Sequence, residues 1–196
     1  MKKITTLVMG VLAAIGLASC DKAPETPAPA PEKGKVLVAY FSASGNTRAV
    51  AEKMAKGLEA DLFEIAPVEL YTDADLDYKN QQSRSYVEMH DDASRPEMKA
   101  KVEDMGKYDV VCIGYPIWWG MAPHIVYNFV ESHDLAGKKV IPFCTAGSGG
   151  IANSVELLHK VDASGSKWSE GAQLKPGDSQ EEITAWALKQ LGSIKD

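Results

Sequence analysis

Residues 36–47, Val-Leu-Val-Ala-Tyr-Phe-Ser-Ala-Ser-Gly-Asn-Thr, contain an apolar run that stops at a loop of small, hydroxyl-bearing residues. The run has the composition of a buried β-strand. A helical pattern follows at once, since Val50, Met54 and Leu58 recur at the spacing of one helix face. A strand that leads through a short loop into a helix N-terminus brings backbone N–H groups and the positive end of the helix dipole together. The stretch therefore predicts an anion site, which we interpret as the phosphate site of a bound nucleotide.

The start of the chain has the pattern of an export signal. A pair of lysines precedes an uncharged apolar run, residues 4–18, which is shorter than the roughly 20 residues that span a bilayer. The run ends in Leu-Ala-Ser-Cys, which resembles the lipobox of bacterial lipoproteins. This resemblance implies that residues 1–19 are a signal peptide and that Cys20 is lipidated. The alternative is a plain signal peptide that is cut near Ala18 and leaves Cys20 as a free thiol.

A proline-rich segment, residues 20–33, follows the expected cleavage site. Its prolines alternate with Ala, Thr and Glu, and it has no large apolar residue, so it favours an extended spacer over a folded element. Lipid on Cys20 would hold the protein durably at a membrane. We therefore expect a membrane-anchored lipoprotein of the cell envelope, facing outside the cytoplasm, with one domain in residues 34–196.

Charge and cysteine content exclude several functions. The formal net charge is −6, and loss of the two lysines in the leader makes it more negative, which argues against nucleic acid as a partner. Cys112 and Cys144 lie in apolar runs and are expected to be buried thiols rather than a disulfide. The four histidines show no metal-ligand spacing, so we expect no metal site.

Strand-like and helix-like patterns alternate along residues 34–196. The second expected strand is residues 61–65, and residues 71–105 are polar, with a weak helical pattern and a second helix expected from Pro96. The last helix is expected from Ser179, because Glu182 completes a capping box. The further strands are expected at residues 109–114, 140–144 and 167–174, with helices after the third and fourth strands.

This alternation predicts an α/β fold, a three-layer, doubly wound, five-stranded parallel sheet with strand order 2-1-3-4-5. In such a sheet ligands bind in the crevice at the carboxyl ends of the strands, where the strand order reverses. The loops after strands 1, 3 and 4 open there. They are residues 42–47, 115–120 and 145–150.

The first loop contains no lysine or arginine, so a phosphate would be held by backbone N–H groups and by the hydroxyls of Ser42, Ser44 and Thr47. Gly45 allows the backbone to approach a ligand closely. A P-loop is excluded because no Gly-Lys-Ser/Thr sequence is present.

The loop resembles the Ser/Thr-x-Ser/Thr-Gly-x-Thr fingerprint of the flavodoxin family, and the similarity of loops and spacing extends over residues 35–192. The resemblance implies flavin mononucleotide (FMN) as cofactor, with its phosphate held by Ser42, Ser44, Gly45, Asn46 and Thr47.

Two further loops are similar to the flavin loops of a bacterial flavodoxin subgroup. The resemblance implies contacts with the isoalloxazine ring from Pro116, Ile117, Trp118, Trp119 and Gly120 in one loop, and from Thr145, Ala146, Gly147, Ser148 and Gly149 in the other. An indole can cover or edge such a flat ring.

No acid, base or nucleophile of the protein is expected to be catalytic, because the flavin supplies the redox chemistry. We therefore expect an electron-transfer protein that serves a redox partner protein or a quinone. The loop at residues 145–150 departs from well-studied flavodoxins, because it has no tyrosine to stack on the flavin. The open face leaves an FMN-dependent NAD(P)H or quinone oxidoreductase as one alternative. The other is a flavin-free binding module of the cell envelope.

Overall fold

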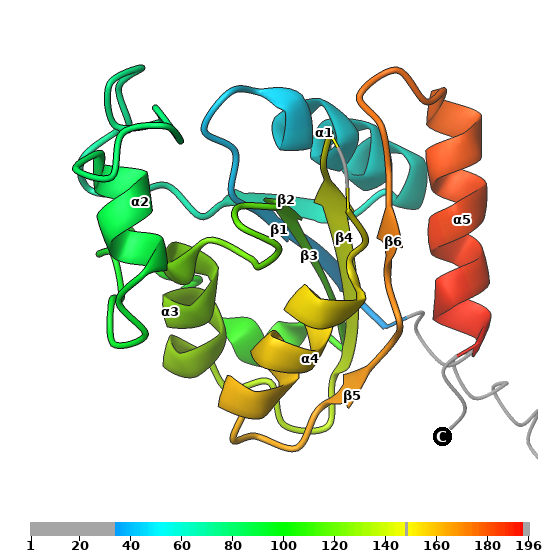
Figure 1. The fold of residues 1–196 in the computed structure, drawn as a ribbon. Helices are drawn as coiled ribbons and strands as arrows, with labels where there is room; N and C mark the ends of the chain where they lie inside the picture. Colours follow the sequence, from blue (N-terminus) through cyan, green and yellow to red (C-terminus); the bar gives the residue numbers. More distant parts are fainter. Residues whose placement is uncertain (1–33, 148, 194–196) are drawn as a thin grey trace, which may run out of the picture. The chain divides into compact units, whose positions relative to one another are not determined.

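The computed structural model describes residues 34–147 and 149–193, which form a parallel β-sheet with helices on both faces (Figure 1). The expected signal peptide, Cys20 and the spacer lie outside the described residues, as does Ser148. The strands are β1 (Val36–Tyr40), β2 (Asp61–Glu64), β3 (Val110–Pro116), β4 (Lys139–Thr145), β5 (Lys167–Trp168) and β6 (Ala172–Gln173). The helices are α1 (Asn46–Leu58), α2 (Arg84–Met89), the 3-10 helix η1 (Met105–Lys107), α3 (His124–Ser132), α4 (Ala152–Val161) and α5 (Gln180–Ser193).

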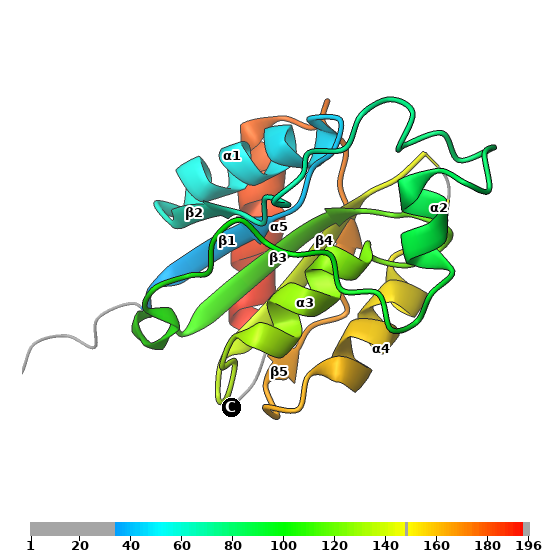
Figure 2. The ribbon, with the colours of Figure 1, turned by 90° about the vertical axis from the view of Figure 1, so that its left-hand side faces the viewer.

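The strand order β2-β1-β3-β4-β5 confirms the predicted topology, and every strand pair is parallel. The centre of the sheet is the pairing of β1 with β3, from Val36 opposite Val110 to Tyr40 opposite Gly114. Helices α1 and α5 pack on one face of the sheet, and α3 and α4 cover the other (Figure 2). The chain therefore passes to opposite faces after β1 and after β3.

Alternating side chains of the central strands fill two separate cores. In β1, Leu37 and Ala39 pack toward α3 and α4, while Val38 and Tyr40 pack toward α1 and α5. All four are buried. Because both faces of the central strands are buried, the sequences of β1 and β3 are nearly continuous apolar runs.

The long connection between β2 and β3 corrects one prediction. No helix begins at Pro96. Instead, the chain beyond it is extended, because the N–H of Lys99 donates to the Ala66 carbonyl at 2.8 Å and that of Val68 donates to the Glu97 carbonyl at 3.0 Å. This antiparallel bridge pairs Pro67 with Met98 and takes up backbone groups that a helix would need. The helix expected before it is the short α2.

The fifth strand is also more irregular than predicted. Instead of one strand over residues 167–174, two short pieces, β5 and β6, pair with different parts of β4. Gly171 lies between them with φ +70°, a conformation that interrupts the ladder. In the last helix the predicted capping box is present, since the Ser179 N–H donates to Glu182 and the Glu182 N–H donates to the Ser179 hydroxyl.

Among the helices that the structure describes, none combines the length and apolarity of a membrane span. Cys112 and Cys144 are both buried free thiols, as predicted, and burial raises the pKa of each to about 12.

The Asp162 carboxylate organises the turn from α4 into β5 and provides a test of the fold. It accepts hydrogen bonds from the hydroxyls of Ser164 and Ser166, and from Trp168 Nε1 at 2.8 Å. Burial acts to raise the pKa of Asp162, but these hydrogen bonds outweigh it and lower the pKa from 3.8 to about 2. Because the folded pKa is the lower one, the carboxylate stabilises the fold above its unfolded pKa, and this stabilisation is lost as the pH falls through about 2.

We therefore expect Asp162→Asn to lower the free energy of unfolding near neutral pH, with the difference from wild type shrinking as the pH falls below about 4. Denaturant unfolding at a series of pH values measures this. The exposed Asp91, as Asp91→Asn, is the control and should change little. A difference for Asp162→Asn that does not depend on pH would refute this role.

Candidate functional site

The loops after β1, β3 and β4 meet at a cavity of about 830 Å³, which we call the carboxyl-edge cavity. It lies where the strand order reverses, the position at which open α/β sheets bind ligands. Its lining comes from the three loops and from the connection between β2 and β3. The lining residues are Ala43, Ser44, Leu76, Tyr78, Ser85, Pro116, Ile117, Trp118, Trp119, Gly120 and Gly147.

The loop after β1 has the features of an anion site. Gly45 has φ +86°, a left-handed conformation that strains other residues, and it precedes α1 without a side-chain cap among the described residues. The first N–H groups of α1 are therefore left for another acceptor. The Ser42 hydroxyl is buried and has no hydrogen-bond partner in the described part of the chain. Ser44 lines the cavity and accepts a hydrogen bond from Asn46 Nδ2 at 3.3 Å.

Thr47 is buried, with an exposed fraction of 1%, and its hydroxyl lies 2.8 Å from that of Thr145. The first and third loops are thus joined by a pair of buried hydroxyls. In such a pair one hydroxyl donates to the other, and the second keeps a proton for a further acceptor. Thr47 therefore joins the first loop to the third through a buried hydroxyl contact.

The loop after β3 closes in a tight turn. Trp118 and Met121 exchange backbone hydrogen bonds of 2.9 Å, and the two residues between them, Trp119 and Gly120, have φ +46° and +79°. Positive φ at both central positions is the pattern of a type I′ turn. Glycine adopts this conformation without strain, whereas tryptophan does not. The turn is fixed from outside, since Asn153 Nδ2 donates to the Gly120 carbonyl at 3.0 Å.

The two tryptophans have different surroundings. Trp118 is partly buried and packs edge-on against Phe41, with ring centroids 5.5 Å apart, and against Tyr71 at 5.3 Å. Trp119 is 38% exposed and contacts Tyr86 and His90 of the α2 region edge-on. Both line the carboxyl-edge cavity, Trp118 as a rigid wall and Trp119 at the rim.

The loop after β4 is small and open. Thr145 is buried, Ala146 is partly buried and accepts a hydrogen bond from Gln173 Nε2 at 2.8 Å, and Gly147 lines the cavity. Gly149 is exposed and has φ +94°. The Thr145 carbonyl accepts from the N–H of Ile117 at 3.0 Å, so the second and third loops are joined as the first and third are.

None of the described residues that line the carboxyl-edge cavity is a lysine or an arginine. Arg48, which is close in sequence, is directed to Tyr40 and Glu64 instead. Arg95 pairs with Glu131 through two hydrogen bonds, of 2.7 and 2.8 Å, which raises the pKa of Arg95. An anion in this cavity would therefore be held by N–H groups and hydroxyls.

Three lining residues, Leu76, Tyr78 and Ser85, were not expected from the sequence. They belong to the connection between β2 and β3, whose helices are the six-residue α2 and the 3-10 helix η1. The available signal was the length of this connection, since long irregular segments inside a domain are commonly functional.

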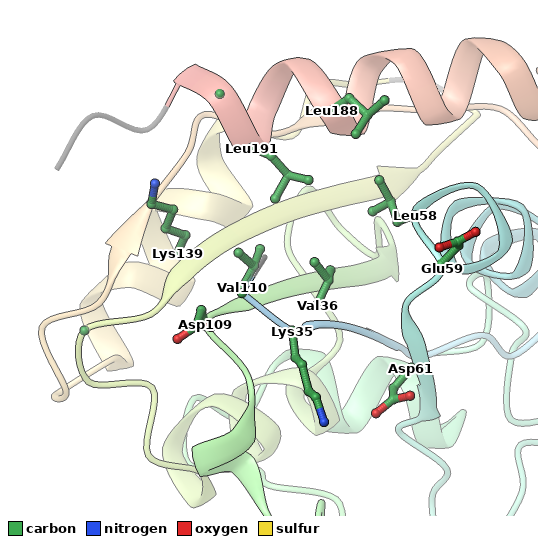
Figure 3. A pocket seen from close by; sticks show the side chains of 13 residues that line it. Lys35, Val36, Leu58, Glu59, Asp61, Asp109, Val110, Lys139, Leu188 and Leu191 are labelled. Carbon is green, nitrogen blue, oxygen red and sulfur yellow. The ribbon is translucent and has the colours of Figure 1, made fainter. Parts of the chain in front are cut away.

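A second cavity, of about 790 Å³, lies at the opposite edge of the sheet. Figure 3 shows that both apolar side chains, among them Leu58, Leu188 and Leu191, and charged ones, among them Lys35 and Asp109, line it. It lies at the amino ends of β1 and β3, away from the three loops and from the switch in strand order. Within the described residues no group of three or more His, Cys, Asp or Glu side chains could hold a metal ion.

Comparisons with known proteins agree with this geometry. The family model described as flavodoxin matches residues 35–190. A candidate flavoprotein from Bacteroides eggerthii has 47% identity and a TM-score of 0.76, covering 81% of this chain and 99% of its own. A candidate flavoprotein from Bacteroides uniformis has 44% identity and a TM-score of 0.75, covering 79% and 98%.

A flavoprotein from Lactobacillus acidophilus, solved in complex with FMN, has the same fold with 22% identity and a TM-score of 0.62, covering 79% of this chain and 99% of its own. No curated protein matches the sequence.

The hydroxyl pair of Thr47 and Thr145 gives a prediction for stability. Thr47→Val or Thr145→Val alone leaves the other buried hydroxyl without its partner, which is expected to cost about 1–3 kcal/mol of the free energy of unfolding. The double variant removes both groups and is expected to cost less than the sum of the single changes. Denaturant unfolding of the four proteins measures the coupling, and strictly additive losses would contradict it.

Proposed function

The chain belongs to the flavodoxin family, and from this premise we propose that it is an FMN-binding electron-transfer protein held at a membrane by lipid on Cys20. The observation that carries the proposal is the convergence of three loops on the carboxyl-edge cavity, with an anion site in one loop and two tryptophans in another. The cofactor is FMN.

The residues of the first loop fit a phosphate group. The uncapped N-terminus of α1 offers N–H donors, and the buried Ser42 hydroxyl lacks a partner among the described residues. Both features have a free-energy cost that a bound phosphate would offset. The positive end of the α1 dipole adds attraction for the charge, in a site whose described lining has no lysine or arginine.

The second and third loops fit the flat ring. Trp118 offers an aromatic surface that Phe41 and Tyr71 hold in place, and Trp119 stands at the cavity rim. Gly120 and Gly147 allow a ligand to approach the backbone. When bound there, FMN would accept electrons and pass them on, and the chain would supply binding and orientation.

A second candidate is an FMN-dependent NAD(P)H or quinone oxidoreductase. It is favoured by the open third loop, where Gly147, Gly149 and Gly150 are exposed and where the sequence of residues 145–150 has no aromatic residue. The electron carrier is preferred because no residue pattern for nicotinamide binding is recognisable in the sequence. The redox partner of a carrier would be a protein or a quinone.

The proposed location in the cell rests on the leader. The lipobox-like sequence at Cys20 and the proline-rich spacer support attachment of the domain to a membrane of the cell envelope, outside the cytoplasm. A change of Cys20 to alanine would remove the lipid attachment and leave the sequence of the domain, residues 34–196, unchanged.

One prediction of the proposed function concerns the phosphate of FMN. Combined Ser42→Ala and Ser44→Ala should weaken FMN binding more than tenfold, because hydrogen bonds to a charged group contribute about 1.5–3 kcal/mol each. Riboflavin lacks the phosphate, so its affinity should change little. Flavin fluorescence during titration of the apoprotein measures both.

Ser132→Ala, on α3 and away from the cavity, is the matched control. Equal losses of FMN and riboflavin affinity in the double variant would mean that this loop does not hold the phosphate.

Another prediction distinguishes an electron carrier from an enzyme. If the protein is a carrier, NAD(P)H alone should leave the bound flavin oxidised over minutes, as followed by its absorbance without oxygen. Chemical reduction with dithionite shows that the flavin is reducible. Rapid bleaching by NAD(P)H, followed by reoxidation on addition of a quinone, would assign the protein to the oxidoreductases.

A further inference from the structure

The connection between β2 and β3 forms a third wall of the carboxyl-edge cavity, in addition to the loops after β1, β3 and β4. Leu76, Tyr78 and Ser85 contribute its lining. Leu76 and Tyr78 offer apolar and aromatic surface, while Ser85 offers a hydroxyl. Tyr78 also carries a hydroxyl but is 68% exposed, so Ser85 contributes the buried hydroxyl of a largely apolar wall, and polar groups placed in this way fix the orientation of a ligand in binding cavities.

The Ser85 hydroxyl forms no hydrogen bond within the described part of the chain. The residue is 2% exposed, and its Oγ has no hydrogen-bond partner within the described residues. Its neighbour Ser83 differs, because the Ser83 hydroxyl accepts from the N–H of Tyr86 and caps α2. A buried hydroxyl without a partner is unfavourable, and a ligand in the cavity that Ser85 lines would satisfy it.

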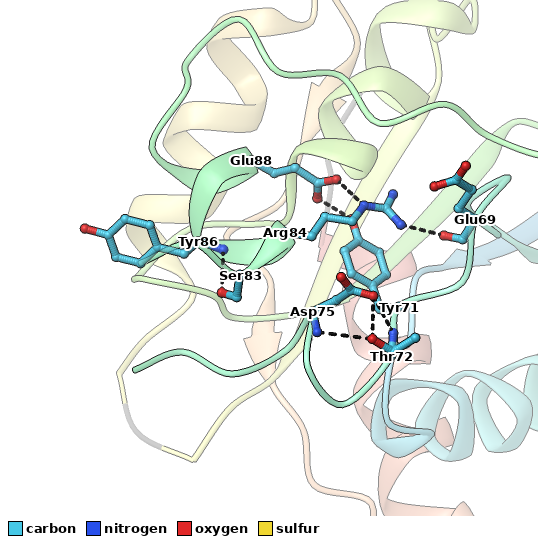
Figure 4. A network of polar contacts seen from close by, with 8 residues as sticks. All are labelled: Glu69, Tyr71, Thr72, Asp75, Ser83, Arg84, Tyr86 and Glu88. Atoms are coloured by element: carbon cyan, nitrogen blue, oxygen red, sulfur yellow. Dashed lines mark hydrogen bonds and ion pairs between the residues drawn. The ribbon is translucent and has the colours of Figure 1, made fainter. Parts of the chain in front are cut away.

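The backbone around Ser85 is held in one position by a network of polar contacts (Figure 4). Arg84 Nε donates to Glu88 Oε1 at 2.6 Å, and Arg84 Nη1 donates to the Glu69 carbonyl at 2.8 Å. The Ser85 N–H donates to the Asp75 carbonyl at 3.0 Å. These contacts tie α2 to the chain that precedes it, so the Ser85 hydroxyl is presented by a fixed support.

Tyr71 connects this support to the tryptophan loop. Its hydroxyl donates to Glu88, and the Arg84 guanidinium lies 4.2 Å from the centre of its ring. Burial and the neighbouring Glu88 raise the pKa of Tyr71, so its hydroxyl stays protonated and keeps donating. The same ring packs edge-on against Trp118. Ser85 and Trp118 are therefore fixed relative to each other by a single set of contacts.

We infer that Ser85 is a further cofactor-binding residue, whose hydroxyl forms a hydrogen bond with the riboflavin part of FMN. The inference rests on the proposed function. The riboflavin part is favoured over the phosphate for two reasons. Ser85 shares its wall with Leu76 and Tyr78, which suit a flat ring, and the phosphate has its own donors in the loop after β1.

The test is a titration of the apoprotein with FMN and with riboflavin, followed by flavin fluorescence. Ser85→Ala should weaken the binding of both flavins by a similar factor, roughly five- to tenfold, as expected for the loss of one hydrogen bond. The absorbance maximum of the bound flavin should also shift. Ser94→Ala, on the same connection but outside the cavity lining, is the matched control and should change neither.

Stability of the apoprotein separates binding from a structural role. Because the Ser85 hydroxyl has no partner in the described chain, Ser85→Ala should leave the thermal midpoint of the apoprotein unchanged or raise it. A lower midpoint together with weaker binding would show that Ser85 supports the fold and would overturn the inference. Unchanged affinity for both flavins, or a loss for FMN alone, would overturn it as well.

Failure of the proposed function gives a different result. In that case the wild-type apoprotein would bind neither FMN nor riboflavin. This result differs from every outcome in which wild type binds flavin and only Ser85→Ala changes the affinity.

Discussion

The structure depends on the parallel pairing of β1 with β3 and on the opposite directions in which the chain leaves these strands. After β1 the chain passes to the face of α1 and α5, and after β3 it passes to the face of α3 and α4 (Figure 2). The carboxyl edge of the sheet is therefore open where the loops after β1 and β3 begin, and β4 contributes its loop from the adjacent position.

The loops that border this opening support one another through hydrogen bonds. The Thr47 and Thr145 hydroxyls join the first loop to the third, and the N–H of Ile117 joins the second to the third. These contacts join the loops of the site, whose described lining has no lysine or arginine. The backbone hydrogen bonds between Trp118 and Met121 hold Trp119 at φ +46°, a conformation that costs free energy and that is found most often at functional sites.

Most of the fold was predictable from the sequence, because strands that are buried on both faces must be apolar throughout. The runs at β1, β3 and β4 have this property. The three loops of the candidate site were predictable in turn, because the order of these strands in the sheet brings the starting points of the loops together. The prediction failed where local pattern was weak: Pro96 suggested a helix, but pairing of Pro67 with Met98 determined the backbone there. Ser85 was not predictable, because its backbone is held by the Asp75 carbonyl and by the contacts of its neighbour Arg84 with Glu88 and Glu69, which no local pattern encodes.

The central claim is that the carboxyl-edge cavity binds FMN. The most direct measurement is identification of the flavin that the purified protein releases on denaturation, together with its amount per chain. We expect a yellow protein that releases FMN, close to one molecule per chain when fully loaded. A colourless protein that takes up no FMN on reconstitution, or a protein that releases FAD, would contradict it.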